Sequence, residues 1–423
     1  MHYRILPKTK YLFNFKDILT VDGALRFCKI SILSLIVVYV GVVFYNITVH
    51  ERQWDFRTYY YASAFDSQHG NPYRFEELSD FSHGFVTEPY VYPPLTLHIW
   101  KIFHIFDYQI SYFLYFILKL LAVALLIFLW QKYFVTNPGY NILMLLFCLF
   151  AFKEAMQVDL YSGNISAFEQ IAIWSGIIFF IRKKPWAFSV LILVASLVKL
   201  ANISLLLLLL LDHDRKSWSA LLSTVTALVG IHAISFLVSP GLAHGFVNSL
   251  LALEEYGSTN QASFVVMKHF ADWLSSLATT EISHLGILLY LLYLVFIIGV
   301  SYFHSRGYNF KNNRLNFVIG GLFLYALTMP RFKDYSFILL IVPAIYIIEK
   351  AISNNYLKIL ISALVLVTFF KYQGFLTIFL LYVIYLRYLV ITKKQSAAPS
   401  SNPGMLFSAL LEKKSLDNLL ESL

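Results

Sequence analysis

Hydrophobic residues in this chain form a series of long apolar runs separated by short polar segments. We predict membrane-spanning helices from these runs, because about 20 consecutive apolar residues cross a bilayer as a helix. Several runs are shorter than that, and the stretch from Pro185 to Leu211 can form either one long helix or two. The predicted spans are 30–49, 109–130, 140–154, 165–181, 187–200, 201–211, 217–238, 284–303, 315–330, 336–349, 357–371 and 374–391.

Charged residues decide between one helix and two in the stretch from Pro185 to Leu211. Arg182-Lys183-Lys184 precedes it and Arg215-Lys216 follows it. Cytoplasmic loops concentrate Lys and Arg, so two crossings place both basic clusters on one side, whereas a single crossing separates them. We therefore expect about twelve spans, with the N- and C-termini on the cytoplasmic side.

The composition supports a membrane protein. Of the 423 residues, 58% are apolar and only 13% are charged, with a mean hydropathy of +0.65. Such a chain cannot cover a water-exposed surface with polar groups. We expect no removable signal peptide, because the first 29 residues are basic and polar. The net charge of +9 follows from the cytoplasmic excess of Lys and Arg, so no nucleic-acid partner is expected. Cys28 and Cys148 lie at or inside apolar runs, which argues against a disulfide framework.

The chain divides into three predicted segments. Residues 1–29 form a cytoplasmic N-terminal segment, and residues 30–391 form an all-α transmembrane domain. Residues 392–423 form a cytoplasmic linker and a short amphipathic tail. Two large loops, at about 50–108 and 239–283, face outward, and loops of that length are usually functional. We interpret 92–106, a short apolar segment in the first loop, as re-entrant or interfacial.

Polar groups near membrane depth are costly, so each one carries a functional hypothesis. Asp55 follows the first span at the mouth of the outward loop. A carboxylate at such a place can act as a general base toward a hydroxyl. The alternative is a helix-end carboxylate that pairs with Arg52 or Arg57.

A second polar group lies later in the same loop. It comprises Tyr92-Pro93-Pro94 together with Glu88 and Tyr90. Consecutive prolines forbid a helix at that point and fix a rigid entry into the apolar segment that follows. The alternative is a plain helix start, which explains the prolines themselves better.

Three cations on the outer side are candidates for an anionic ligand. Lys199 stands amid apolar residues, and phosphate is the anion that such a cation suits unless the side chain only snorkels at a helix end. Arg331 and Lys333 alternate around Phe332 in an outward turn and can meet a phosphate at the membrane surface. A solvated turn with an ion pair to Asp334 is the alternative.

No pattern in the chain requires a metal or another cofactor. Asp212-His213-Asp214 has the acidic-x-acidic spacing that holds a divalent metal in many soluble sugar-nucleotide enzymes. It lies on the predicted cytoplasmic side beside Arg215-Lys216, and we interpret it as a solvated turn. The outward histidines show no metal-ligand spacing.

In their order along the chain, these groups resemble the polytopic GT-C glycosyltransferases of glycosyltransferase family 87. That family includes mycobacterial polyprenyl-phosphate-mannose-dependent mannosyltransferases. The resemblance covers roughly residues 30 to 390. The matching residues are Asp55 with Tyr59-Tyr60, Gly70-Asn71-Pro72-Tyr73, Tyr92-Pro93-Pro94-Leu95, Gly163-Asn164, Lys199, Asn260-Gln261 with Ser263, and Arg331 to Tyr335.

The resemblance implies a GT-C-like bundle that moves a sugar, mannose or similar, from a polyprenyl-phosphate donor to a hydroxyl of a lipid or glycan acceptor. It implies inversion at the sugar, with Asp55 as the base and with Lys199, Arg331 and Lys333 at the donor phosphate. A histidine found in many relatives is missing where this chain reads Phe332-Lys333-Asp334-Tyr335. The implied sugar- or acceptor-binding residues are Tyr59, Tyr60, Glu88, Tyr92, Asn164, Asn260, Gln261 and Tyr335.

Two other classes of membrane protein remain alternatives. An O-antigen polymerase or ligase also places basic residues near an outward loop, but it uses a lipid pyrophosphate glycan. A secondary transporter has repeated halves and broken helices at the bilayer midplane, and neither is visible here. We expect a bacterial inner membrane location, with the site facing outward.

Overall fold

The computed structural model describes residues 21–50, 52–212, 214–252, 260–278, 284–308, 313–369 and 371–397. Throughout these ranges the regular structure is helical, and the β-structure consists of one isolated bridge between Asn260 and Lys333. The predicted all-α fold is therefore confirmed. The predicted amphipathic tail and the first 20 residues lie outside the described ranges.

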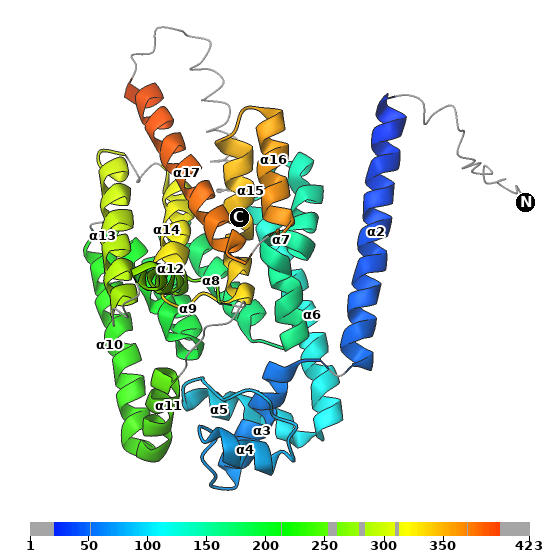
Figure 1. Ribbon diagram of the computed structural model, residues 1–423, viewed down its shortest axis with the longest axis vertical. Helices are drawn as coiled ribbons and strands as arrows, with labels where there is room; N and C mark the ends of the chain where they lie inside the picture. The colour runs from blue at the N-terminus through cyan, green and yellow to red at the C-terminus, as the bar shows by residue number, and fades with distance from the viewer. Residues whose placement is uncertain are drawn as a thin grey trace, which may run out of the picture.

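Most helices run along the long axis of the molecule, side by side (Figure 1). Among the described residues, six helices are long and apolar enough to cross a membrane. They are α2 (Val21–Val49), α6 (Tyr108–Tyr133), α7 (Asn141–Ser162), α10 (Arg215–Val238), α13 (Leu285–Ser305) and α17 (Gln373–Ala397).

Shorter apolar helices coincide with the remaining predicted spans. Their lengths do not by themselves establish twelve crossings, so that number stays a prediction. They are α8 (Ser166–Ile181), α9 (Pro185–Val198), η3 (Leu200–Leu211), α14 (Arg314–Thr328), η5 (Asp334–Leu340), α15 (Ile341–Lys350) and α16 (Asn355–Leu366).

The pattern of burial is that of a protein surrounded by hydrocarbon. The centre holds fully buried apolar side chains such as Trp174 and Phe323. Large apolar residues are also exposed on the outer helices, for example Leu292 and Val295 of α13. A water-soluble protein rarely exposes so much contiguous apolar surface, and exposed leucines and valines on a helix are what a lipid-facing surface requires.

The chain reverses direction at Lys199. Its ammonium contacts Ser166 at the start of α8, whereas the end of η3 lies at the other end of α8. There, Arg314 donates to the carbonyl oxygen of Phe180 at 2.8 Å and forms an ion pair with Asp212. α9 and η3 therefore run in opposite directions along α8, as the basic clusters on either side of them predict.

The first outward loop forms a layer across one end of the bundle, which we call the cap (residues 54–106). The cap contains α3 (Trp54–Ser67), α4 (Phe75–Phe81), α5 (Leu95–Trp100) and η1 (Lys101–Ile105). In Figure 1 it lies below the helices, at the lower ends of α6 and α10. Between α2 and α3 the backbone turns at Gln53, whose φ is +59°. α3 is therefore a separate helix outside the spanning α2.

Aromatic packing attaches the cap to the bundle. The ring of Phe56 stacks on Tyr115 of the bundle helix α6, with centroids 4.3 Å apart. Within the cap, Tyr59 stacks on Trp100 of α5 at 4.4 Å. Such ring pairs contribute beyond their buried area. α5 and η1 are only six and five residues long, and Ile99, Ile102 and Ile105 are exposed together on them. The re-entrant or interfacial placement of 92–106 stays a prediction.

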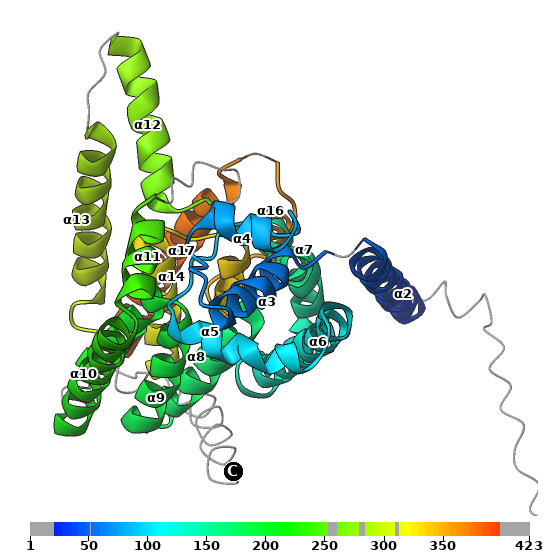
Figure 2. The ribbon, with the colours of Figure 1, turned by 90° about the horizontal axis from the view of Figure 1, so that it is seen from below.

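The second outward loop supplies α11 (Pro240–Ala252) and α12 (Ser263–Ala278). α11 packs on the cap, where Phe246 meets the ring of Tyr73. α12 lies across the bundle axis and projects from it beside α13 (Figure 2). The α2 helix stands to one side in both views.

Candidate functional site

The turn between α7 and α8 contacts the start of α3 directly. Gly163 has φ +69°, and a Cβ there would lie 2.8 Å from Cβ of Gln53 and 3.1 Å from Cβ of Phe56. The amide of Gln53 also donates to the carbonyl of Tyr161 at 2.6 Å. Only glycine fits both the conformation and the contact, which brings the adjacent Asn164 against the first turn of α3.

Asn164 connects three residues that the sequence predicts for the site. Its Nδ2 donates to Oδ2 of Asp55 at 2.7 Å, to the hydroxyl of Tyr92 at 2.9 Å and to that of Tyr59 at 3.3 Å. The Tyr59 hydroxyl donates to that of Tyr92 at 2.8 Å. Oδ1 of Asn164 accepts from Oγ of Ser166 at 2.7 Å, and this bond fixes which end of the amide faces Asp55.

A buried ion pair in the bundle supports this turn. Nζ of Lys119 in α6 lies 2.7 Å from Oδ2 of Asp159 in α7, and both side chains are fully buried. Nζ also donates to the carbonyl oxygens of Asp159 and Asn164. The hydroxyl of Tyr115 donates to the carbonyl of Gly163 at 2.9 Å. Two side chains of α6, those of Lys119 and Tyr115, thus fix the Gly163–Asn164 turn by hydrogen bonds to its carbonyl oxygens.

Burial and the neighbouring groups have opposite effects on the pKa of Asp55. Burial raises the pKa of the Asp55 carboxyl, while the hydrogen bond from Asn164 and the positive charges of Lys333, Lys119 and Lys199 lower it. Burial is the largest cause, so the pKa lies above the usual range for aspartate. Burial also raises the pKa of the Tyr92 phenol, which therefore stays protonated and can donate a hydrogen bond.

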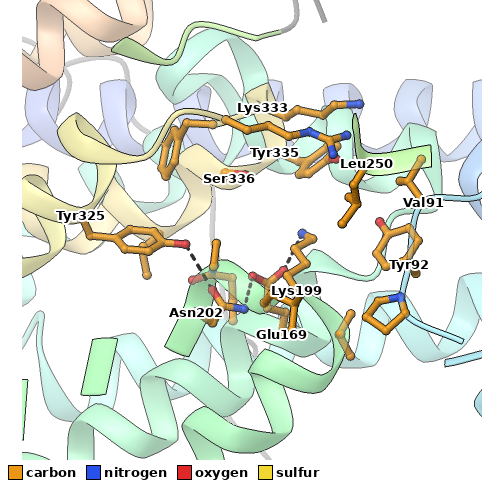
Figure 3. Close-up of a pocket in the computed structure, with 18 of the residues that line it drawn as sticks. Val91, Tyr92, Glu169, Lys199, Asn202, Leu250, Tyr325, Lys333, Tyr335 and Ser336 are labelled. Carbon is orange, nitrogen blue, oxygen red and sulfur yellow. Dashed lines mark hydrogen bonds and ion pairs between the residues drawn. The ribbon is translucent and has the colours of Figure 1, made fainter. Parts of the chain in front are cut away.

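A cavity of about 220 Å³ lies beside Tyr92. It is formed by the cap, the start of α8, the break between α9 and η3, α11, α14 and the turn before η5. Lys199, Arg331 and Lys333 all line it. Figure 3 shows Lys333 and Tyr335 on one side of this cavity and Lys199 on the other, with Tyr92 at one end. The three predicted phosphate ligands are therefore brought together, although 134 positions separate Lys199 from Lys333 in the chain.

Lys199 is already paired with a carboxylate. Its Nζ lies 2.5 Å from Oε2 of Glu169 in α8, donates to Oγ of Ser166 at 2.6 Å and lies 4.7 Å from the centre of the Tyr335 ring. Asn202 donates to Oε1 of Glu169 at 2.9 Å, and the hydroxyl of Tyr325 donates to Oδ1 of Asn202 at 3.3 Å.

The sequence reasoning missed the roles of Glu169, Asn202 and Tyr325. A signal for Glu169 was present, because it is a carboxylate inside the predicted span 165–181, and such residues normally face the protein interior and have a partner. Nothing in the local sequence distinguishes Tyr325 from the other aromatic residues of the apolar runs.

Asn260 and Gln261 hold the turn that carries Arg331 and Lys333. Oδ1 of Asn260 accepts from the amide of Phe332 at 3.1 Å. Nε2 of Gln261 donates to Oδ1 of Asp334 at 3.2 Å, and its Oε1 accepts from the amide of Gly374 at 2.8 Å. Both residues are buried and neither lines the cavity, so their contacts are those of supports for the turn.

Asp334 is a buried carboxylate of the same turn. Nζ of Lys153, in a left-handed segment of α7, lies 3.6 Å from its Oδ2. Burial raises the pKa of Asp334 to about 6, despite the opposing effects of Lys153 and Gln261. Asp334 therefore contacts α7 through Lys153, and the charge of Lys333 in its own turn also acts to lower its pKa.

Two predicted site residues lie elsewhere on the cap. The hydroxyl of Tyr60 donates to the carbonyl of Phe106 at 3.2 Å, and Glu88 is exposed. Neither lines the cavity. At the opposite end of the bundle, Asp212 is mostly buried against Arg314, so the interpretation of this residue as part of a solvated turn is wrong. His213 lies outside the described residues.

A family model for glycosyltransferase family 87 matches residues 90–330, more than half of the chain. The chain belongs to glycosyltransferase family 87. No curated protein and no solved structure matches it. The matched region contains Tyr92, Asn164, Glu169 and Lys199. With the apolar helices described above, the family identifies a multi-pass membrane glycosyltransferase.

Proposed function

We propose that this family 87 member is an inverting glycosyltransferase that uses a polyprenyl-phosphate-linked sugar, mannose or similar. The acceptor is a hydroxyl of a lipid or a glycan. The proposal rests on two hydrogen bonds from the Asn164 amide, one to Asp55 and one to Tyr92. Tyr92 lines a cavity that Arg331 and Lys333 also line. Through Tyr92 and Asn164, the proposed base is thus connected to the cavity that the proposed phosphate ligands line.

In the proposed reaction, the oxygen of the acceptor hydroxyl attacks the anomeric carbon while one of the Asp55 oxygens accepts the proton of that hydroxyl. The bond between the anomeric carbon and the phosphate oxygen breaks, and its electron pair leaves with the phosphate. A single displacement inverts the anomeric centre. Half-burial of Asp55 and its raised pKa favour proton uptake, because a base works best when its pKa approaches the working pH.

Departure of the phosphate requires positive charge rather than a strong acid. Arg331 and Lys333 line the cavity from a turn that Asn260 and Gln261 hold in place. Guanidinium and ammonium groups bind phosphate through charge-assisted hydrogen bonds. We assign the direct phosphate contacts to these two residues, and to Lys199 a longer-range contribution, because Glu169 offsets its charge.

The position of the site supports an outward orientation. Asp55 and the cap lie at one end of the bundle, whereas Asp212, Arg314 and the basic segment 182–184 gather at the other end. Since cytoplasmic loops concentrate Lys and Arg, we propose that the cap faces the outside of a bacterial inner membrane. Both termini then lie in the cytoplasm, and twelve crossings satisfy this arrangement.

The test is transfer of radiolabelled sugar from a panel of polyprenyl-phosphate sugars by purified wild type and Asp55→Asn, supplied with membranes of the native host. We expect label in an acceptor with the wild type and a loss of about 10²- to 10⁴-fold with Asp55→Asn. Binding of the donor should persist in the variant.

Three outcomes would contradict parts of this proposal. A fully active Asp55→Asn removes the base assignment. Transfer only from a lipid pyrophosphate glycan moves the protein to a polymerase or ligase class. Counter-transport in liposomes without sugar transfer would indicate a transporter.

A further inference from the structure

One wall of the cavity carries a continuous row of hydrogen-bonded side chains. Tyr325 donates to Asn202, Asn202 donates to Glu169, and Glu169 pairs with Lys199. Figure 3 shows the four side chains side by side, with Ser336 and Tyr335 facing them across the cavity. The row comes from three elements, α8, the α9–η3 break and α14, and the fold therefore orients it as a unit.

Glu169 is the unusual member of this row. The residue is only 7% exposed, and a buried carboxylate is costly unless it is paired and hydrogen-bonded. Lys199 and Asn202 meet that requirement. A carboxylate accepts hydrogen bonds at about four lone-pair positions, so Glu169 retains capacity to accept from a ligand in the cavity.

The negative charge of Glu169 disfavours an anion on the side of the cavity that holds Lys199. A phosphate seated on Lys199 would lie next to a carboxylate whose oxygen is 2.5 Å from the same Nζ, and juxtaposed like charges disfavour binding. Lys333 lies on the other side of the cavity from Lys199 (Figure 3). The wall with Glu169 therefore suits a neutral ligand that donates hydrogen bonds.

Hydroxyl groups of a sugar meet this description. Glu169 accepts from a hydroxyl, the amide of Asn202 and the phenol of Tyr325 offer further partners, and the ring of Tyr335 covers the ammonium of Lys199 from across the cavity. Resting on the proposed function, we propose that Glu169 and Asn202 form the subsite that binds the hydroxyls of the transferred sugar. Glu169 thereby selects which sugar is used.

The burial of Glu169 is the reason that it can discriminate between sugars. A site that hydrogen-bonds a substrate hydroxyl discriminates strongly against an analogue without it, because the buried polar group of the protein is then left unpaired. Replacing the carboxylate with a carboxamide removes the charge while keeping the size. Glu169→Gln should therefore lower kcat/KM for the preferred sugar and reduce the preference over its epimers.

The experiment compares wild type, Glu169→Gln and Glu169→Gln/Lys199→Met with polyprenyl-phosphate mannose, glucose and galactose and with deoxy analogues of the preferred sugar. Both transfer and the donor-induced rise in unfolding temperature are measured. We expect Glu169→Gln to lower kcat/KM for the preferred donor about 10- to 100-fold. The value of kcat/KM for the deoxy analogues should change much less. Glu154→Gln is the control, because Glu154 is an exposed carboxylate of α7 that does not line the cavity.

Two results would overturn the inference while leaving the proposed function intact. One is a uniform loss for all donors with unchanged ratios. The other is full recovery of activity and ratios in the double variant, which would show that Glu169 serves only to neutralise Lys199. If the wild type neither transfers from nor is stabilised by any polyprenyl-phosphate sugar, the proposed donor class itself is wrong, and the sugar subsite with it.

Discussion

Nδ2 of Asn164 lies 2.7 Å from Oδ2 of Asp55, although the two residues are 109 positions apart in the chain. The same amide group donates to Tyr92, and its carbonyl oxygen accepts from Ser166. Asn164 therefore links the carboxylate at the start of α3 to the cavity and to the start of α8. Because the family assignment makes the protein a glycosyltransferase, this amide becomes the first target for mutation.

We predict that Asn164→Ala lowers kcat/KM about 10- to 100-fold, the effect of losing a hydrogen bond to a charged group. Since that bond lowers the pKa of Asp55, its loss raises the pKa further. A base acts in its deprotonated form, so the acid limb of the profile of kcat/KM against pH should move to higher pH. The measurement is transfer from the donor over a pH series.

A matched control for Asn164→Ala exists at the other end of the bundle. Asn354→Ala removes the side chain that accepts from the amides of Tyr356 and Leu357 at the start of α16. It should lower the unfolding temperature slightly through the lost cap and leave the pH profile in place. An unshifted profile in Asn164→Ala would contradict the electrostatic role of Asn164.

The buried pair of Lys119 and Asp159 gives a second prediction. Lys119→Met leaves a buried carboxylate without its partner, which costs about 3–5 kcal/mol. The double variant Lys119→Met/Asp159→Asn removes both charges and should recover part of that loss. Thermal unfolding in detergent micelles, followed as apparent midpoints because such a protein need not unfold in two states, measures both.

A partly exposed ion pair in the cap is the control for the buried pair of Lys119 and Asp159. Lys101 and Asp66 form an ion pair of 2.8 Å, but the Lys101 side chain is 36% exposed. Lys101→Met should cost no more than about 1 kcal/mol, as exposed pairs do. Equal effects of Lys119→Met and Lys101→Met would refute the claim that burial makes the bundle pair important.

Gly163 gives a third prediction. Gly163→Ala places a Cβ 2.8 Å from Gln53 and forces alanine to adopt φ +69°. The conformation alone costs about 1–2 kcal/mol, and the clash should displace Asn164 from Asp55. We expect a lower unfolding midpoint together with a loss of transfer.

Gly230→Ala is the control for this substitution. Gly230 lies within α10, and a Cβ there meets no atom within 4 Å. Alanine is a better helix former than glycine by about 1 kcal/mol, so Gly230→Ala should be neutral or stabilising. Normal activity and stability of Gly163→Ala would show that the α3 contact tolerates a side chain.

The fourth prediction concerns pH and Asp334. Burial raises the pKa of this carboxyl from 3.8 to about 6, so the folded protein binds the proton more tightly than the unfolded chain. The stability contributed by this proton is fully present below pH 3.8 and is lost as the pH rises through 6. Asp334→Asn lacks this dependence.

The measurement for Asp334 is the unfolding midpoint of wild type minus that of Asp334→Asn. We expect the difference to fall as the pH rises from 3.8 to about 6 and to be level above about pH 7. Taking the difference cancels the titration of groups that both proteins share. A difference that stays constant over this interval would mean that folding does not raise the pKa of Asp334.

Apolar runs alone determined where the helices of the bundle lie, but not those of the two outward loops. Every predicted span coincides with a helix of the structure, because a backbone in hydrocarbon must satisfy its hydrogen bonds within each segment. The basic clusters on either side of residues 185–211 also predicted the reversal at Lys199. These properties depend on local sequence and on the solvent, so no tertiary contact was needed to infer them.

Only the tertiary structure decided which polar residues meet. The sequence marks Asp55 and Lys199 as candidates, but nothing local indicates that Asn164 contacts Asp55 and that Glu169 contacts Lys199. Tyr60, next to Tyr59 in sequence, points to Phe106 instead of the cavity, because consecutive helix residues face different directions. Such contacts depend on how α3, α8 and the α9–η3 break pack together. That packing is set by side-chain shape and by fits such as that of Gly163 against Gln53, which a pattern of apolar and polar residues does not encode.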